Sequence, residues 1–235
     1  MARQPELNGM MRAILIDWLV EVHMKFRLLP ETLYLCVNII DRYLSLEQVY
    51  RNRLQLVGVT SLLIACKYEE MYPPEVKDCV YITDRAYTRQ DVLDMEANIV
   101  KVLRFSLTVP TGHPFLQRFL YITESSALVR NLANYYMERM LQEHSALEFK
   151  PSLLAAAAVC LANSNPDRLD CEGFSEEDHR EKIVSDGMKF LIGLVRSFIF
   201  SSCRFQPLFS LRYLSTTLDF TRMTSAKLLL TLKPK

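Results

Sequence analysis

The hydrophobic positions of residues 10–26 cover more of a helical surface than one buried face can hide. At about 100° per residue, one apolar stripe faces one side and a second points roughly the opposite way. The first stripe consists of Met11, Leu15, Trp18 and Val22 with Ile14 beside it, and the second consists of Ala13, Ile16, Val20 and Met24. The polar residues between the stripes are Arg12, Asp17, Glu21 and His23. The pattern predicts a helix that is either central to a bundle or partly reserved for a partner.

Helical periodicity continues along the chain, which has only six glycines and few of the alternating runs typical of strands. Further helices are predicted at residues 30–45, 53–68, 76–82 and 88–103. Pro30 suits a first helical position, because its missing N–H is not needed there. Thr88 suits an N-cap, because its hydroxyl can accept a bond from an early backbone N–H. The sequence therefore predicts five helices in the first hundred residues.

Residues 105–114 are predicted to separate two helical series, because two prolines and a glycine within this run oppose a continuous helix. This boundary divides the chain into predicted domains 1–108 and 109–235. The second series is predicted at residues 115–122, 125–142, 151–162 and 188–200. Residues 163–185 are polar and acidic, and they are predicted to be a solvated loop with a short helix.

Composition favours a protein partner over a nucleic acid. Half of the 235 residues are hydrophobic, which provides a substantial core, and the formal net charge is only +1. The six cysteines have no pair at the short spacings of zinc or redox sites, which is typical of a reducing compartment. No run approaches the roughly 18 apolar residues of a membrane span, and residues 1–9 lack a signal peptide's apolar centre. We expect a cytosolic or nuclear location.

No catalytic or metal-binding motif is evident in the sequence. A glycine-rich phosphate loop, a kinase catalytic loop and a nucleophile elbow are all missing. The four histidines lie far apart, at no spacing that would build a metal site. Glu69 and Glu70 are adjacent, so on a helix they point about 100° apart and do not form a carboxylate pair. We expect no enzyme activity, no metal and no cofactor, and therefore a binding function.

Seven blocks of the first hundred residues closely resemble the first cyclin box of A- and B-type cyclins, and most closely that of mitotic B-type cyclins. They are RAILIDWL at 12–19, MKFRL at 24–28, IDRYL at 40–44, LQLVG at 54–58, KYEEMYPPE at 67–75, YITD at 81–84 and ME at 95–96. They occur in the family's order and at its spacing. The resemblance implies an all-α fold of two tandem five-helix cyclin boxes. Mitotic cyclins usually carry a further N-terminal helix and a destruction signal before the first box, and residues 1–9 contain neither pattern.

The resemblance implies a regulatory subunit that binds and activates a cyclin-dependent protein kinase and controls mitotic entry, in the nucleus and cytoplasm. In the family, a lysine and a glutamate of the first box hold the backbone around the kinase's C-helix. The matching residues here are Lys67 and Glu96. Apolar neighbours pack against the same kinase helix, and the matching positions are Ile64, Tyr68, Phe105 and Leu107.

The resemblance also implies a shallow docking patch for Arg-x-Leu peptides of substrates and inhibitors. Its matching positions are Met11, Ile14, Leu15, Trp18, Glu21, Leu54, Gln55 and Asp84. Glu21 would meet the peptide's cation, with help from Asp84. Core packing is the alternative explanation for Trp18, the only tryptophan of the chain. Arg12 and Asp41 match a pair of the family that joins the first two helices by a structural ion pair.

Two other functions stay open at this point. Cyclin boxes also build a general transcription factor that bridges polymerase and promoter DNA, and such a protein would present a basic surface. The near-neutral charge of this chain does not favour that alternative. An all-α enzyme with a site assembled from dispersed residues is the other alternative.

Overall fold

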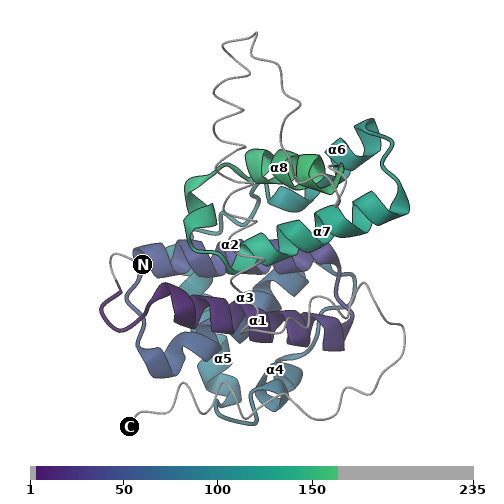
Figure 1. The fold of residues 1–235 in the computed structure, drawn as a ribbon. Helices are drawn as coiled ribbons and strands as arrows, with labels where there is room; N and C mark the ends of the chain where they lie inside the picture. Colours follow the sequence, from purple (N-terminus) through teal and green to yellow (C-terminus); the bar gives the residue numbers. More distant parts are fainter. Residues whose placement is uncertain (1–3, 164–235) are drawn as a thin grey trace. The chain divides into compact units, whose positions relative to one another are not determined.

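The computed structural model describes residues 4–163, and every regular element in this part of the chain is a helix (Figure 1). The first series comprises α1 (Gly9–Phe26), α2 (Pro30–Leu46), η1 (Arg51–Arg53), α3 (Leu54–Glu69), α4 (Val76–Ile82) and α5 (Arg89–Val102). The second series comprises α6 (Gly112–Ile122), α7 (Ala127–Gln142), η2 (Ser145–Glu148) and α8 (Pro151–Asn163). The prediction of an all-α fold is confirmed, while the loop predicted at residues 163–185 and the helix predicted at 188–200 lie almost entirely outside the described residues.

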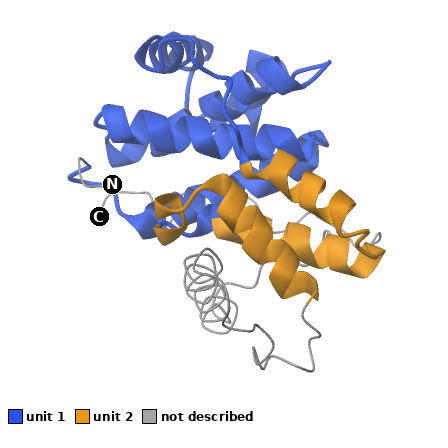
Figure 2. Ribbon diagram, turned by 90° about the horizontal axis from the view of Figure 1, so that it is seen from above, with its two compact units in different colours: residues 1–111, 141–144, 217–235 blue, residues 112–140, 145–216 orange. Residues whose placement is uncertain are grey.

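The chain divides into two compact units (Figure 2). Of the described residues, 4–111 and 141–144 belong to the first unit, and 112–140 and 145–163 belong to the second. In the second unit α6 packs against α8. The small side chains of Ala155, Ala157 and Ala158 are buried, which permits a close approach between helices.

Helix α3 forms the centre of the first unit. All of its residues from Leu54 to Cys66 are buried, and it packs against α1, α2, α4 and α5. Gly58 permits the approach of α1, because a Cβ atom at this position would lie 2.7 Å from Cδ1 of Leu15. A helix surrounded by others buries its whole circumference, so its sequence shows an apolar run in place of an amphipathic pattern.

Helix α1 buries side chains of both predicted stripes. Leu15 and Trp18 of the first stripe are buried, and so are Ile16 and Val20 of the second. Met11, at the edge of the first stripe, stays half-buried. Helix α1 is therefore packed into the bundle through residues of both stripes, and it also leaves part of its apolar surface half-buried.

Two helices begin with a reciprocal capping box. At α5, Oγ1 of Thr88 accepts from the Asp91 N–H at 3.1 Å, and Oδ2 of Asp91 accepts from the Thr88 N–H at 2.9 Å. Glu75 and Asp78 form the equivalent box at α4. The predicted N-cap at Thr88 is thus present in the structure.

Several helices end at a residue with a left-handed backbone that is not glycine. These residues are Arg27 after α1, Asp84 after α4, Arg104 after α5 and Glu124 after α6, with φ between 45° and 54°. Glycine is the usual residue at such a position, since it has no Cβ to clash with the backbone. These ends carry no glycine signal, yet the predicted ends at residues 26, 82, 103 and 122 lie within one residue of the observed ones.

Helix α6 begins inside the segment that we predicted to be free of helix. It starts at Gly112, so Pro114 lies in its first turn. A proline is tolerated there because backbone N–H groups of the first turn have no intrahelical partner. The two short helices η1 and η2 were not predicted either. No described helix is long and apolar enough to cross a bilayer.

Candidate functional site

Lys67 and Glu96 form an ion pair on the surface of the first unit. Lys67 lies in the last turn of α3 and Glu96 lies in α5, and Nζ of the lysine is 2.6 Å from Oε1 of the glutamate. The lysine side chain is 47% exposed and the glutamate side chain 19% exposed. In water such a pair contributes about 0–1 kcal/mol to stability, so it is available to a partner at little cost to the fold.

Two aromatic side chains are exposed, one in the last turn of α3 and one three residues after α5. Tyr68 follows Lys67 directly and is 46% exposed, and Phe105 is 78% exposed. The Tyr68 hydroxyl and Oγ1 of Thr108 are joined by a hydrogen bond of 2.5 Å. This bond ties the end of α3 to the segment that follows α5.

The other two predicted apolar neighbours are less accessible. Ile64 is only 3% exposed and belongs to the core of the first unit. Leu107 is half-buried and packs against that core. The structure therefore presents two of the four predicted apolar neighbours, Tyr68 and Phe105, as exposed side chains.

The backbone after α5 sets the position of Phe105. The N–H groups of Arg104 and Phe105 donate to the carbonyls of Lys101 and Val100, both at 3.0 Å, in a Schellman motif. Both donors have a left-handed backbone, with φ of 52° at Arg104 and 58° at Phe105. Non-glycine residues in this region cost of order 1 kcal/mol or more each, and such strain clusters at functional positions.

The predicted docking patch is only partly accessible. Leu15, Trp18 and Leu54 belong to the core, where Trp18 retains 7% exposure, and Gln55 retains 9%. The half-buried members are Met11, Ile14 and Glu21, and Asp84 is exposed. The α1 and α3 members come together through the contact between these helices. Only a small part of the Trp18 surface therefore remains for a ligand.

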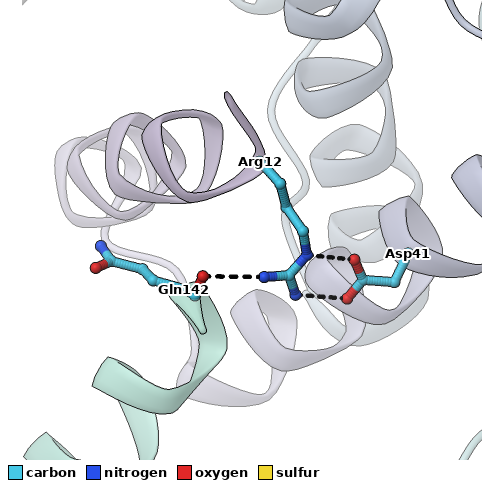
Figure 3. Close-up of polar contacts among 3 residues, drawn as sticks. All are labelled: Arg12, Asp41 and Gln142. Carbon is cyan, nitrogen blue, oxygen red and sulfur yellow. Dashed lines mark hydrogen bonds and ion pairs between the residues drawn. The ribbon is translucent and has the colours of Figure 1, made fainter. Parts of the chain in front are cut away.

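Arg12 is a buried cation that binds three oxygen atoms (Figure 3). Its Nε and Nη2 atoms donate to the two carboxylate oxygens of Asp41 at 2.6 and 2.7 Å, and Nη1 donates to the Gln142 carbonyl at 3.2 Å. The arginine side chain is 2% exposed. Gln142 also donates from Nε2 to Oδ1 of Asp17 at 2.9 Å. The arginine thus joins α1 to α2 and to the end of α7, within the first unit.

The described cysteines are all free, and three of them are buried in the first unit. Burial raises the pKa of Cys66 from its ordinary value of 9.0 to about 12, with a smaller contribution from Glu70. Burial likewise raises the pKa of Cys79 to about 12, with Asp78 and Glu96 adding to the shift. These thiols stay protonated and unreactive at neutral pH. Within residues 4–163, no cluster of histidine, cysteine or acidic side chains is suited to a metal ion.

Gln4 is a residue that sequence reasoning missed. Its side-chain Nε2 donates to the carbonyls of Leu44 and Glu47 at 2.7 and 2.6 Å, and its Oε1 accepts from the Val49 N–H at 3.0 Å. These bonds fix the residues before α1 against the end of α2. A single glutamine in a polar run gives no signal of such a role.

Comparison with known proteins identifies both parts of the chain. Residues 1–108 match the family described as "Cyclin, N-terminal domain", and residues 110–178 match "Cyclin, C-terminal domain". The chain is 52% identical to "Cyclin-B1-3" of Arabidopsis thaliana over 184 residues, which are 75% of this chain and 44% of the relative. It is 51% identical to "G2/mitotic-specific cyclin-1" of Medicago sativa subsp. varia over 162 residues, which are 69% of this chain and 38% of the relative. The chain thus spans less than half the length of these relatives.

Solved structures show the same fold at low sequence identity. A viral cyclin from Herpesvirus saimiri has a TM-score of 0.69 at 19% identity, and the match covers 83% of this chain and 88% of the viral one. A chain of the yeast RNA Pol II CTD kinase CTDK-1 complex has a TM-score of 0.66 at 16% identity, over 95% of this chain and 74% of that chain. Since two cyclin domains match in tandem and B-type cyclins share about half of the aligned residues, the chain belongs to the cyclin family.

Proposed function

We propose that this chain is a non-catalytic regulatory subunit that binds and activates a cyclin-dependent protein kinase at mitotic entry. The observation that carries the proposal is the Lys67–Glu96 ion pair, which is accessible on the first unit, together with exposed Tyr68 in the last turn of α3 and exposed Phe105 after α5. Aromatic side chains are enriched at interface centres, and charged groups there fix the register of the partner. The B-type names of the relatives supply the cell-cycle context.

The proposed mechanism is a shift between two kinase conformations. A protein kinase is competent only when a lysine–glutamate pair joins its small-lobe strand to its C-helix. A regulatory subunit stabilises that conformation by as much as it binds it more tightly than the inactive one. A switch from mostly inactive to mostly active kinase needs about 5 kcal/mol of differential affinity. Lys67 and Glu96 would bind backbone groups at the ends of the C-helix, and the aromatic side chains would cover its apolar face.

An exchange of the two charges tests this proposal. The double variant Lys67→Glu/Glu96→Lys keeps an attraction between α3 and α5, so it should fold, but it presents the opposite charge to each kinase group. We expect it to lose most activation of a purified cyclin-dependent kinase in a histone phosphorylation assay. Lys67→Ala alone should weaken binding by about 2–5 kcal/mol, because Glu96 would be left unpaired in the interface.

Arg118→Glu serves as the control, since it changes an exposed charge on α6, in the other unit. Full activation of the kinase by the charge-exchanged variant, with the native thermal stability, would disprove the proposed binding of the kinase by Lys67 and Glu96.

We further propose that the half-buried apolar surface of α1 docks Arg-x-Leu peptides of substrates and inhibitors. The half-buried state of Met11 and Ile14 over the core supports this, as does the presence of Glu21 on the same helix. Trp18→Ala is a poor test, because removal of a buried tryptophan costs about 3–5 kcal/mol of stability. Met11→Ala is the better variant, with Met10→Ala as its matched control, since Met10 is 60% exposed and points about 100° away.

Titration of an Arg-x-Leu peptide by calorimetry measures the effect. We expect Met11→Ala to weaken binding severalfold and Met10→Ala to leave it unchanged. Equal affinities of the two variants for the peptide would contradict the proposal that the half-buried surface of α1 docks Arg-x-Leu peptides.

A further inference from the structure

Lys25 lies on the same face of α1 as the proposed docking surface. Ile14, Glu21 and Lys25 follow one another at spacings of seven and four residues, so at about 100° per residue they lie within about 40° of one another around the helix. Ile14 and Glu21 are half-buried, whereas Lys25 is exposed in the last turn. A peptide that lies along this face therefore meets an apolar side chain, then a carboxylate and then an ammonium group.

An aromatic ring of α4 contacts this ammonium group. Nζ of Lys25 lies 5.5 Å from the centroid of the Tyr81 ring, and Tyr81 is 67% exposed. The face of an aromatic ring attracts a cation but does not neutralise its charge. Among residues 4–163, no carboxylate forms an ion pair with Lys25. The lysine thus has a restricted position and a positive charge that can still pair with an anion.

The order of these residues along α1 sets the direction of a docked Arg-x-Leu peptide. If its arginine pairs with Glu21 and its leucine lies near Ile14, the peptide runs opposite to the helix, because Ile14 precedes Glu21. The residues before the peptide's arginine then continue towards Lys25. Glu21 and Lys25 are separated by a rise of about 6 Å along the axis, which two residues of an extended peptide span at about 3.3 Å each.

We propose that Lys25 is a specificity-determining residue of the docking surface, which favours peptides with an acidic residue two positions before the arginine. The inference depends on the proposed docking function, because it extends the surface of Met11, Ile14 and Glu21 by one turn of α1. Glu21 and Lys25 together are complementary to the pattern acid-x-Arg-x-Leu. A basic residue at the same peptide position would face a like charge, which disfavours such a peptide.

A series of three peptides tests the inference on the native chain. The peptides share one Arg-x-Leu sequence and differ only two positions before the arginine, where they carry glutamate, alanine or lysine. Calorimetry at low salt measures the dissociation constant of each. We expect the glutamate peptide to bind about threefold to tenfold more tightly than the lysine peptide, because an exposed charge pair changes affinity by only a small factor. The preference should shrink at high salt, since both charges are in contact with water.

A charge reversal assigns the preference to one residue. We expect Lys25→Glu to reverse the order of the three peptides, with a thermal midpoint close to that of the native chain because the side chain is exposed. Lys101→Glu is the matched control, since it makes the same change of charge at an exposed lysine of α5. This control should keep the native order of the peptides.

Equal affinities of the native chain for the glutamate and lysine peptides would overturn the role of Lys25, and so would an unchanged order in Lys25→Glu. Tighter binding of the lysine peptide by the native chain would also contradict it, because the charge of Glu21 would then outweigh that of Lys25. These failures are distinct from failure of the docking proposal, which is read from the alanine peptide with the native chain and Met11→Ala. If the alanine peptide does not bind the native chain, both proposals are wrong.

Discussion

The side chain of Arg12 is a positive charge that is almost completely buried in the first unit. Its guanidinium is removed from water and binds both oxygens of Asp41 and the Gln142 carbonyl. An isolated buried charge costs several kcal/mol, and bidentate pairing offsets that cost. The pair is thus a condition for folding more than a net source of stability.

Removal of the partner carboxylate should therefore destabilise the protein strongly. We expect Asp41→Ala to lower the free energy of unfolding by about 3–5 kcal/mol, because the Arg12 charge would be left without its counter-ion. Urea denaturation followed by circular dichroism measures the change. The double variant Arg12→Met/Asp41→Ala should recover part of the loss, since it has no stranded charge.

A loss below 1 kcal/mol in Asp41→Ala would mean that water reaches the guanidinium and that the site is not buried in solution. The same measurement must precede any binding experiment on Arg12 variants. Otherwise a loss of kinase affinity could simply report unfolding.

The structure leaves some of the predicted site residues exposed and buries others, for a physical reason. The resemblance pointed to Lys67 and Glu96, which form an ion pair in the structure, but no pattern distinguishes an exposed Tyr72 from a buried Tyr34. Exposure depends on which helices cover a residue, and that information is tertiary. Trp18 shows the same limit, because the resemblance placed it in a docking patch while three-dimensional packing leaves it 7% exposed.

At the scale of elements, the contact between α1 and α3 depends on one missing side chain. Gly58 lies in the middle of α3, and Leu15 of α1 occupies the space that its Cβ would need. Glycine in a helix costs about 1 kcal/mol relative to alanine. The close approach of the helices must compensate for this cost.

Two effects compete when Gly58 is replaced by alanine. The helix gains about 1 kcal/mol in propensity, while an overpacked core costs about 1–3 kcal/mol. With the added Cβ atom 2.7 Å from Cδ1 of a fully buried leucine, we expect the packing cost to dominate and the free energy of unfolding to fall by up to about 2 kcal/mol. Denaturant unfolding measures this difference.

A double-mutant cycle checks the cause. Leu15→Ala alone should cost about 2–5 kcal/mol, and its combination with Gly58→Ala should cost less than the sum of both, because the new methyl group fills part of the cavity. Strict additivity would show that the two side chains do not meet.

The capping box of Thr88 and Asp91 begins α5, the helix that also carries Glu96. We expect Thr88→Ala to lower the free energy of unfolding by about 1 kcal/mol, since the Asp91 N–H loses its acceptor. The effect should depend on pH. The Thr88 hydroxyl and backbone hold the Asp91 pKa below its ordinary value of 3.8, so this part of the stability is present above that value and disappears as the pH falls through the lowered pKa.

The measurement is thermal unfolding of the native chain and Thr88→Ala at neutral and acidic pH. The gap between their midpoints should narrow in acid. A gap that is constant with pH would show that Asp91 takes no part in the cap.

The helices were largely predictable from their apolar spacing, and within residues 4–163 each predicted helix end lies within one residue of the observed one. The starts at Pro30 and Val76 were predicted correctly, as they depend on local chemistry. α1 ends at Phe26 as predicted, although the left-handed backbone of the next residue, Arg27, carries no glycine signal. The start of α6 was misplaced because a proline in a first turn does not exclude a helix.

At the scale of the whole molecule, the core of the first unit also buries three thiols, Cys36 from α2, Cys66 from α3 and Cys79 from α4. Their burial favours the protonated form and so links stability to alkaline pH. Below the ordinary thiol pKa of 9.0, Cys66 and Cys79 are protonated in both the folded and the unfolded chain, and stability does not depend on their titration. Above that value the unfolded chain loses these protons, while the folded chain retains them until about pH 12.

Stability should therefore fall as the pH rises from 9 towards 12, by about 1.4 kcal/mol per pH unit for each fully protected thiol. Urea unfolding at a series of pH values measures the slope, and lysine and tyrosine titrations contribute to it as well. Cys79→Ala isolates the thiol, because it lowers stability at every pH by its cavity but should make the alkaline slope shallower. If the native chain and Cys79→Ala lose stability in parallel above pH 9, then the thiol is ionised inside the fold, and the core that surrounds it must admit water.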